Sequence, residues 1–495
     1  FYIYSFCNQR YKSYYILFFY NDKVKLKTTN SKAAKKENER MSIKEAQTKY
    51  GAVSGVDMQT YTVFRGIPYA KPPVGELRFE PPVEPESWTG VRKADKFPNR
   101  AFQRPQNEGF YGKEFYSVPE YMPDCSEDCL YLNIWTPANT ADEKLAVAVW
   151  IHGGAFSAGY GSEMEFDGKA FAEKGVILVT INYRLGVLGF LAHPALTAAS
   201  HRHISGNYGI LDQLAALRWV KENISAFGGD PDNVTLFGQS AGGMSVQTIC
   251  TSPLGKGLIS KAVIQSAGGY KSVLISDQTL REAEEYGTGF ARKIGCESVE
   301  DLKKAPAEDL IRAADEMMME AFRKMEETGE SPRVSLPFSP VIDGYVLTED
   351  CNRAIDDGSI ADIPYILGSN GDDMGKGMPG AENFPDDGHG PLYHAAKDFS
   401  LKLQELGRRP AWCYYFDRKM PGDEAGAFHS AELWYVFGTY QRCWRPLTEK
   451  DAVLSAKMVS FWTNFMKYSD PNAPGTEDWR PCTEKDPFVY SFDVE

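Results

Sequence analysis

Short, almost continuously apolar segments recur along the chain from about residue 48 onward. The clearest are rich in β-branched residues and cover residues 146–151, 176–181, 233–237 and 262–265, with further examples at 365–367 and 412–416. Near-continuous hydrophobicity is typical of strands that helices cover on both faces of a parallel sheet. The pattern therefore predicts several buried strands in one sheet.

Apolar residues at helical spacing separate these runs. Over 212–227 they recur three or four positions apart, and Gly228-Gly229 then ends the pattern. A last helix is predicted over 454–466 by the same spacing. Strands that alternate with helices indicate βαβ units, so the sequence predicts an α/β fold with a mainly parallel central sheet flanked by helices.

Residues 1–40 differ from the rest of the chain. They contain an aromatic stretch at 14–20 and then a lysine-rich polar segment, which is a poor match to a secretory signal. We expect a disordered or artefactual leader there. Beyond it we find no internal repeat and no linker rich in Gly, Ser or Pro, so residues 41–495 are predicted to form a single domain with insertions.

Charge and cysteine usage narrow the classes of partner. A formal net charge of −13 over 495 residues would repel phosphate backbones and anionic lipid, which argues against a nucleic-acid partner. Small neutral substrates fit this charge better, but its simpler explanation is that it keeps a large surface soluble, so it identifies no substrate. No apolar run is long enough to span a bilayer, so no membrane partner is expected. The nine cysteines have no zinc-type spacing, so we expect no metal site.

A candidate nucleophile follows the strand predicted at 233–237. The segment Gly238-Gln239-Ser240-Ala241-Gly242 fits the pattern G-x-S-x-G, whose glycines let a strand turn sharply into a helix. The pattern alone is weak, but here a strand precedes it and a helix can begin at Ala241. That helix start would offer backbone N–H groups to an oxyanion formed at Ser240.

A second source of oxyanion donors lies at the end of the strand predicted at 146–151. There the chain reads His152-Gly153-Gly154-Ala155-Phe156, and small residues let backbone N–H groups approach a ligand closely. A plain glycine turn is the alternative interpretation. Because this segment and the helix start after Ser240 would each supply N–H donors to the same oxyanion, we favour an oxyanion loop.

A reactive serine needs a base and an acid, which follow it in the order acid, then histidine, in this fold. Three histidines come after Ser240. His389 and His394 lie in a stretch rich in Gly, Asp and Pro that is predicted to be a loop, whereas His429 precedes the apolar segment 433–437 and is the favoured base. The acid should end the strand predicted at 365–367, where spacing alone leaves both Asp372 and Asp373 open.

These motifs resemble the type B carboxylesterase and cholinesterase family. The similarity extends from about residue 48 to the C-terminus, and it is carried by four segments: 64–70 (FRGIPYA), 72–79 (PPVGELRF), 126–133 (SEDCLYLN) and 237–243 (FGQSAGG). The resemblance implies an α/β-hydrolase fold and a serine esterase that requires no cofactor.

Carried over residue by residue, the resemblance implies a nucleophile, a base, an acid and three oxyanion N–H donors, respectively Ser240, His429, Asp373, and Gly154, Ala155 and Ala241. The acid departs from the family pattern, because most members have Glu in the sequence D-E-G where this chain has Asp372-Asp373-Met374. An aspartate is one methylene shorter, so contact with the histidine requires a small backbone shift or a role for the neighbouring Asp372.

Other departures narrow the type of esterase. Phe102 stands where the family's usual disulfide partner of Cys129 is expected, so Cys129 is predicted to be a free thiol. No cysteine lies between Cys250 and Cys296 to form the usual second pair. Both losses favour a reducing cytoplasm and a microbial, para-nitrobenzyl-esterase-like enzyme. Gln239 replaces the acidic residue that precedes the serine in cholinesterases, which argues against acetylcholine.

The predicted activity is hydrolysis of small neutral carboxylic esters through an acyl-enzyme. One alternative is a catalytically silent binding or adhesion protein on the same fold, of which the family has examples without the serine. The other is a lipase or a hydrolase of a specialised natural ester.

Overall fold

The computed structural model describes residues 42–275, 278–328, 337–378, 380–474 and 476–494. The leader predicted for residues 1–40 lies outside these ranges. Residues 41–495, predicted as one domain with insertions, cluster into one compact unit.

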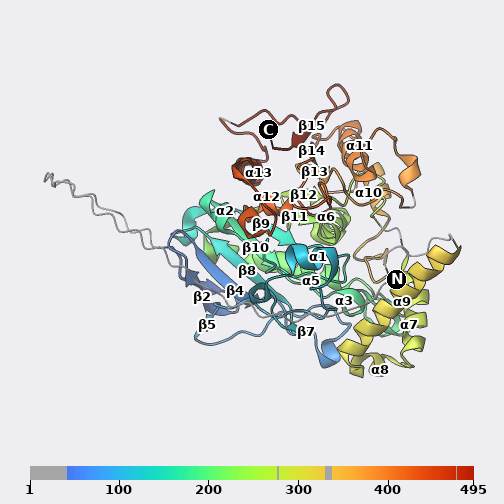
Figure 1. Ribbon diagram of the computed structural model, residues 1–495. Helices are drawn as coiled ribbons and strands as arrows, with labels where there is room; N and C mark the ends of the chain where they lie inside the picture. The colour runs from blue at the N-terminus through green and yellow to red at the C-terminus, as the bar shows by residue number, and fades with distance from the viewer. Residues whose placement is uncertain (1–41, 276–277, 329–336, 379, 475, 495) are drawn as a thin grey trace, which may run out of the picture. The chain divides into compact units, whose positions relative to one another are not determined.

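A large mixed sheet runs through this unit (Figure 1). Its strands, in spatial order, are β15 (Val489–Phe492), β14 (Trp412–Phe416), β13 (Tyr365–Asn370), β12 (Lys261–Gln265), β11 (Gly229–Gln239), β9 (Leu145–Ile151), β10 (Val176–Ile181), β8 (Tyr131–Thr136), β4 (Thr62–Pro68) and β3 (Val56–Asp57). The strands from β15 to β10 pair in parallel, while β8, β4 and β3 pair antiparallel at one edge. The predicted mainly parallel sheet of an α/β fold is confirmed.

The parallel strands are buried on both faces, which explains their continuous hydrophobicity. In β9 the side chains of Val147, Val149 and Ile151 join one hydrophobic core, and those of Ala148 and Trp150 join the core on the opposite face. Successive strand side chains point to opposite faces, so a run without polar residues satisfies both cores at once.

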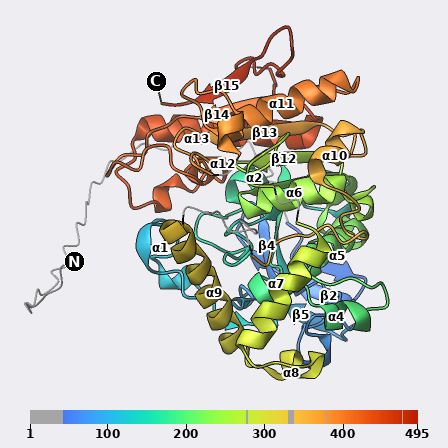
Figure 2. The ribbon, with the colours of Figure 1, turned by 90° about the vertical axis from the view of Figure 1, so that its right-hand side faces the viewer.

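Helices cover the two faces unequally. The core that contains Val147 and Ile151 also takes side chains from α3 (Gly186–Phe190), α4 (Pro194–Ala199), α5 (Tyr208–Asn223), α6 (Ala241–Thr251), α7 (Leu280–Lys293), α8 (Val299–Lys304), α9 (Ala307–Thr328), α10 (Cys351–Asp356) and α11 (Pro391–Glu405). The core that contains Trp150 takes them from α1 (Gly109–Phe115), α2 (Lys169–Glu173), α12 (Leu433–Val436) and α13 (Glu449–Tyr468). Figure 2 shows α7, α8 and α9 grouped together.

Smaller elements complete the described ranges. One small sheet contains β1 (Glu45–Thr48), β2 (Gly51–Ser54) and β5 (Val91–Lys93), and another pairs β6 (Arg100–Ala101) with β7 (Cys125–Ser126). Short 3₁₀ helices cover Gly75–Leu77, Pro119–Tyr121, Ala141–Glu143, Ile224–Phe227, Pro253–Gly255, Ala381–Asn383 and Tyr440–Arg442. Helix α1 lies in the connection between β6 and β7, so these two strands close a loop that carries it.

One loop prediction was wrong. His394 lies within helix α11, which begins at Pro391 directly after the stretch rich in Gly and Asp. Proline is well suited to the first turn of a helix, because its missing N–H would have no partner there. The proline therefore starts a helix where the composition suggested a loop.

Within the described ranges, every helix is too short or too polar to cross a bilayer.

Candidate active site

Ser240 stands at the turn between β11 and α6. Its backbone has φ 55° and ψ −128°, a conformation that side-chain-bearing residues rarely adopt. A Cβ at Gly242 would lie 2.0 Å from the carbonyl oxygen of Ile151, and one at Gly238 would lie 2.5 Å from the carbonyl carbon of Gly242. The two glycines of the motif are therefore needed because strand β9, strand β11 and the helix start approach too closely for any side chain.

His429 and Asp373 are joined by a hydrogen bond. His429 Nδ1 lies 2.5 Å from Asp373 Oδ1, and both side chains are almost fully buried, at 5% and 2% exposed. Asp373 Oδ2 accepts the backbone N–H of Asn370 at 2.8 Å, and Oδ1 accepts that of Met374. An aspartate thus reaches the histidine here, although the family usually has the longer glutamate.

The neighbouring Asp372 points elsewhere. Its Oδ2 accepts hydrogen bonds from the Lys419 ammonium at 2.9 Å and from the Ala427 backbone N–H at 2.8 Å. It therefore holds the segment before His429 rather than the imidazole. The spacing of the two aspartates could not separate these roles, because each contact depends on where segment 417–429 folds.

Charge stabilises the pair. Burial opposes both ionised forms, but the His429 imidazolium and its hydrogen bond lower the pKa of Asp373 below its ordinary value. For His429, burial lowers the pKa, and the Asp373 carboxylate outweighs this effect and raises it above its ordinary value. The geometry favours an N–H on Nδ1, which leaves Nε2 as the basic nitrogen.

The loop after β9 carries candidate oxyanion donors. Gly154 has φ 100° and Ala155 has φ 52°, and a Cβ at Gly153 would lie 3.1 Å from Ser240 Cβ. None of the N–H groups of Gly154, Ala155 and Ala241 donates to another residue in the described ranges. Backbone N–H groups rarely stay unpaired in a folded protein, and unpaired donors beside Ser240 have the position that stabilisation of an oxyanion there would require.

Gln239 makes a contact that the sequence did not predict. Its Nε2 lies 3.2 Å from His429 Nε2, so the amide can donate to the basic nitrogen of the ring. The described residues include no hydrogen bond between that nitrogen and the Ser240 hydroxyl. Catalytic hydrogen bonds are often loose in a protein without substrate, so the arrangement is consistent with a resting site.

A buried polar network behind the histidine was also missed. Glu432 is fully buried and accepts from Asn370 Nδ2 at 2.6 Å and from Gln265 Nε2 at 3.2 Å. Asn370 Nδ2 also donates to the Phe428 carbonyl at 2.7 Å. Burial raises the pKa of Glu432 to about 7. The spacing of three residues after His429 and three before Asp373 is a signal that could have marked Glu432 and Asn370.

The other candidate histidines lie outside this arrangement. His389 Nδ1 and His394 Nε2 both contact Asp387 Oδ1, at 3.2 Å and 3.1 Å.

No group of three or more His, Cys, Asp or Glu in the described part of the chain could hold a metal ion. Cys129 is a buried free thiol, as predicted.

Comparison with known proteins identifies the family. The model of the carboxylesterase family matches residues 42–385 and 391–495. The chain belongs to the carboxylesterase family. It is similar to a fumonisin B1 esterase of Sphingopyxis macrogoltabida, 40% identical over 447 residues that cover 90% of this chain and 74% of that protein. It is also similar to a para-nitrobenzyl esterase of Bacillus subtilis, 35% identical over 474 residues that cover 86% and 90%.

Solved structures agree with this membership of the carboxylesterase family. A PNB esterase structure has a TM-score of 0.77 at 33% identity and covers 91% of this chain and 96% of that one. A carboxylesterase of Geobacillus stearothermophilus has a TM-score of 0.73 at 31% identity, with the same coverage. The resemblance to type B carboxylesterases is confirmed, and the fold is that of an α/β-hydrolase. The chain is a serine carboxylic-ester hydrolase whose substrates are small esters.

Proposed function

We propose that catalysis uses Ser240 as nucleophile, His429 as base and Asp373 as the orienting acid, with the N–H groups of Gly154, Ala155 and Ala241 as the oxyanion hole. The observation that carries this proposal is the 2.5 Å hydrogen bond from His429 to Asp373, which is made by Nδ1 and so makes Nε2 the ring nitrogen that can act as a base. The sharp turn at Ser240 and the three unpaired N–H donors support it.

The chemistry is two acyl transfers. Nε2 of His429 takes the Ser240 proton as Oγ bonds to the ester carbonyl carbon, and the N–H donors hold the oxyanion. Collapse breaks the bond to the alcohol oxygen, which leaves with the proton from His429. Water then gives a proton to His429 and attacks the acyl carbon, and the proton returns to Ser240 Oγ as the acid departs.

We further propose that the substrates are neutral esters. A surface with a net charge of −13 gives no attraction to nucleic acid or to anionic lipid. The name of the para-nitrobenzyl esterase suggests a para-nitrobenzyl ester as the first synthetic substrate to test.

Residence in a reducing cytoplasm is also proposed. Cys129, Cys250, Cys351, Cys413 and Cys482 are buried free thiols, a pattern that suits a reducing compartment. Thiol titration of protein prepared from the native organism, under denaturing conditions, should find these cysteines reduced. A stable disulfide among them would contradict this location.

Hydrolysis of p-nitrophenyl acetate, butyrate and decanoate tests the proposed catalytic residues. Ser240→Ala should lower kcat by at least about 10³-fold on each ester, because no other group supplies the nucleophile. Circular dichroism should show that the variant stays folded. A Ser240→Ala protein as active as the wild type would contradict the proposal that Ser240 is the nucleophile. The dependence of the wild-type rate on acyl chain length would begin to define the acyl pocket.

A further inference from the structure

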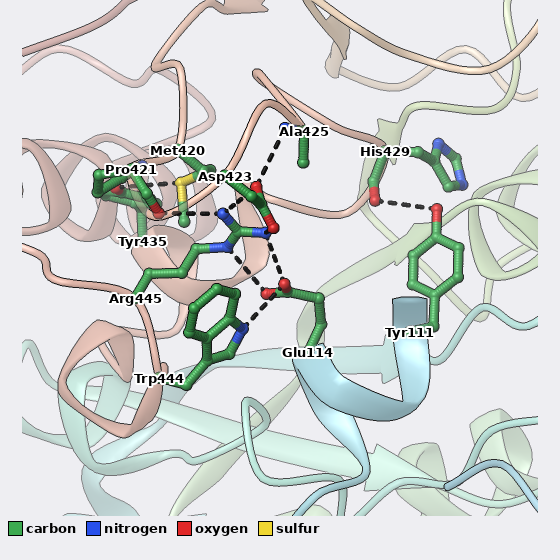
Figure 3. Close-up of polar contacts among 10 residues, drawn as sticks. All are labelled: Tyr111, Glu114, Met420, Pro421, Asp423, Ala425, His429, Tyr435, Trp444 and Arg445. Carbon is green, nitrogen blue, oxygen red and sulfur yellow. Dashed lines mark hydrogen bonds and ion pairs between the residues drawn. The ribbon is translucent and has the colours of Figure 1, made fainter. Parts of the chain in front are cut away.

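Helix α1 contacts the segment that carries His429, although 318 positions separate Tyr111 from His429 in the sequence (Figure 3). The Tyr111 hydroxyl donates to the His429 carbonyl oxygen at 3.3 Å. The rings of Phe110 and Phe115 pack on Phe428, with centroids 4.9 and 6.5 Å apart. The helix therefore touches the residue before the histidine and the histidine's own backbone.

A buried ion pair fixes the other end of this helix. Glu114 and Arg445 have side chains with no exposed surface, and Arg445 Nη2 and Nε donate to the two carboxylate oxygens at 2.6 and 3.1 Å. Trp444 Nε1 donates to the same carboxylate at 2.9 Å. Because the contact is a fork with two parallel hydrogen bonds, it sets the direction of the helix as well as its distance.

The same guanidinium also holds the segment that leads to His429. Arg445 Nη1 donates to the Pro421 carbonyl at 3.0 Å and to Asp423 Oδ1 at 2.7 Å. Its central carbon lies 5.1 Å from the centroid of the Phe428 ring. Figure 3 shows Arg445 between Glu114 on one side and Asp423 and Pro421 on the other, so one side chain links α1 with segment 420–429.

Stability is a weak explanation for such a pair. Removing a guanidinium and a carboxylate from water costs about as much as their attraction returns, and apolar residues of similar size often do as well. What a buried, forked pair supplies is one fixed arrangement of the elements that it joins. Here those elements are α1 and the segment that positions the imidazole of the proposed triad.

We propose that Arg445 and Tyr111 are positioning residues for His429. Arg445 holds α1 against segment 420–429, and the Tyr111 hydroxyl fixes the His429 peptide so that Nδ1 stays within hydrogen-bond distance of Asp373. This proposal rests on the proposed function of His429 as the base. Without either residue, the His429 ring moves away from Asp373. Proton transfer from Ser240 and the support that Asp373 gives to the imidazolium then become weaker.

Tyr111→Phe tests the hydroxyl alone, because the ring stays to fill its place. We expect kcat on p-nitrophenyl butyrate to fall about fivefold with KM unchanged, the order of one lost hydrogen bond. The acid limb of the pH profile should move to lower pH, because less contact with Asp373 lowers the pKa of His429. The matched control is Tyr365→Phe, which removes a buried tyrosine hydroxyl that donates to the Ala361 carbonyl at 2.7 Å.

The double variant Glu114→Gln, Arg445→Met tests the ion pair without leaving a lone buried charge. We expect kcat to fall about 10²-fold, the order expected when a reacting group is misplaced by about 1 Å. The control is Arg78→Met, Glu127→Gln, another forked pair, with Nε to Oε2 at 2.7 Å, that joins other segments. It should keep the wild-type kcat and pH profile.

Two sets of outcomes separate the proposals. If the wild type has no esterase activity, or if His429→Ala keeps it, the proposed function fails. If His429→Ala is inactive but Tyr111→Phe keeps both the wild-type kcat and the wild-type acid limb, the positioning proposal is overturned. Tyr111→Phe decides the matter even if the double variant does not fold.

Discussion

The serine side and the histidine side of the site are built by different physical means. On the serine side, Gly238 and Gly242 allow main-chain segments to approach so closely that a methyl group would not fit. On the histidine side, His429 and the segment before it are contacted by Asp373 and Asp372 in the loop after β13 and by Tyr111 of α1. Steric exclusion within a few residues therefore defines one half, and long-range polar contacts define the other.

The difference predicts how each half fails. A substitution of Gly238 or Gly242 on the serine side should damage folding, because the close approach belongs to the centre of the sheet. A substitution on the histidine side should damage catalysis first, because the sheet forms without it. The following predictions test this contrast.

The largest effect is expected from Asp373→Asn. The amide can no longer act as the carboxylate that orients Nδ1–H and supports the imidazolium, so kcat should fall about 10⁴-fold at pH 7. Ester hydrolysis and the melting temperature should be measured on the same protein. If the histidine side supports catalysis and not folding, the variant loses activity while its melting temperature stays close to that of the wild type.

Asp372→Asn is the matched control for that substitution. It is the adjacent residue with the same change, but its carboxylate contacts Lys419 and Ala427 instead of the imidazole. We expect less than about a tenfold loss of kcat, the order of one weakened hydrogen bond. Equal losses in the two variants would contradict the assignment of the acid to Asp373.

Gly242→Ala should destabilise the protein by about 3 kcal/mol, because the new methyl group would meet a backbone carbonyl oxygen in the packed centre of the sheet. Urea unfolding measures the loss. Gly289→Ala is the control: this helical glycine in α7 has open space where a Cβ would lie, and alanine there should be neutral or slightly stabilising. An unchanged midpoint for Gly242→Ala would show that the site does not depend on this approach.

The smallest effect concerns Glu432, whose pKa burial raises to about 7 from an ordinary 4.5. Between these values the folded protein keeps a proton that the unfolded chain releases, so this group's contribution to stability is complete below pH 4.5 and is lost as pH rises through 7. Because glutamine does not ionise, Glu432→Gln should remove this pH-dependent loss of stability. Relative to wild type, the variant should gain about 2 kcal/mol between pH 5 and pH 8.

Urea unfolding at the two pH values checks this prediction, with Glu424→Gln, at an exposed glutamate, as a control for the change of charge. A gain that does not depend on pH would mean that Glu432 keeps the same protonation state throughout.

The sequence predicted the serine side well. The runs at 146–151 and 233–237 became β9 and β11, and the motif glycines lie where both strands end. This was readable because the determinants are adjacent in the chain and because burial on both faces leaves a continuous apolar run.

The histidine side was predicted only in part. His429 and the pair Asp372-Asp373 could be found from chain order, but the choice between the aspartates required the family pattern. Glu114 and Arg445 are 331 positions apart, and no periodicity links a buried charge on a short helix to its partner. Helix α1 could not be predicted either, because its seven residues are too few to show a clear helical spacing of apolar positions.

The pairing of β9 with β11 has a consequence for redesign. Neighbouring parallel strands are held about 4.8 Å apart by their main-chain hydrogen bonds. The loop after one strand and the serine after the other inherit that spacing. An engineer could therefore exchange side chains elsewhere around the site while the separation between the proposed nucleophile and the proposed donors stays fixed.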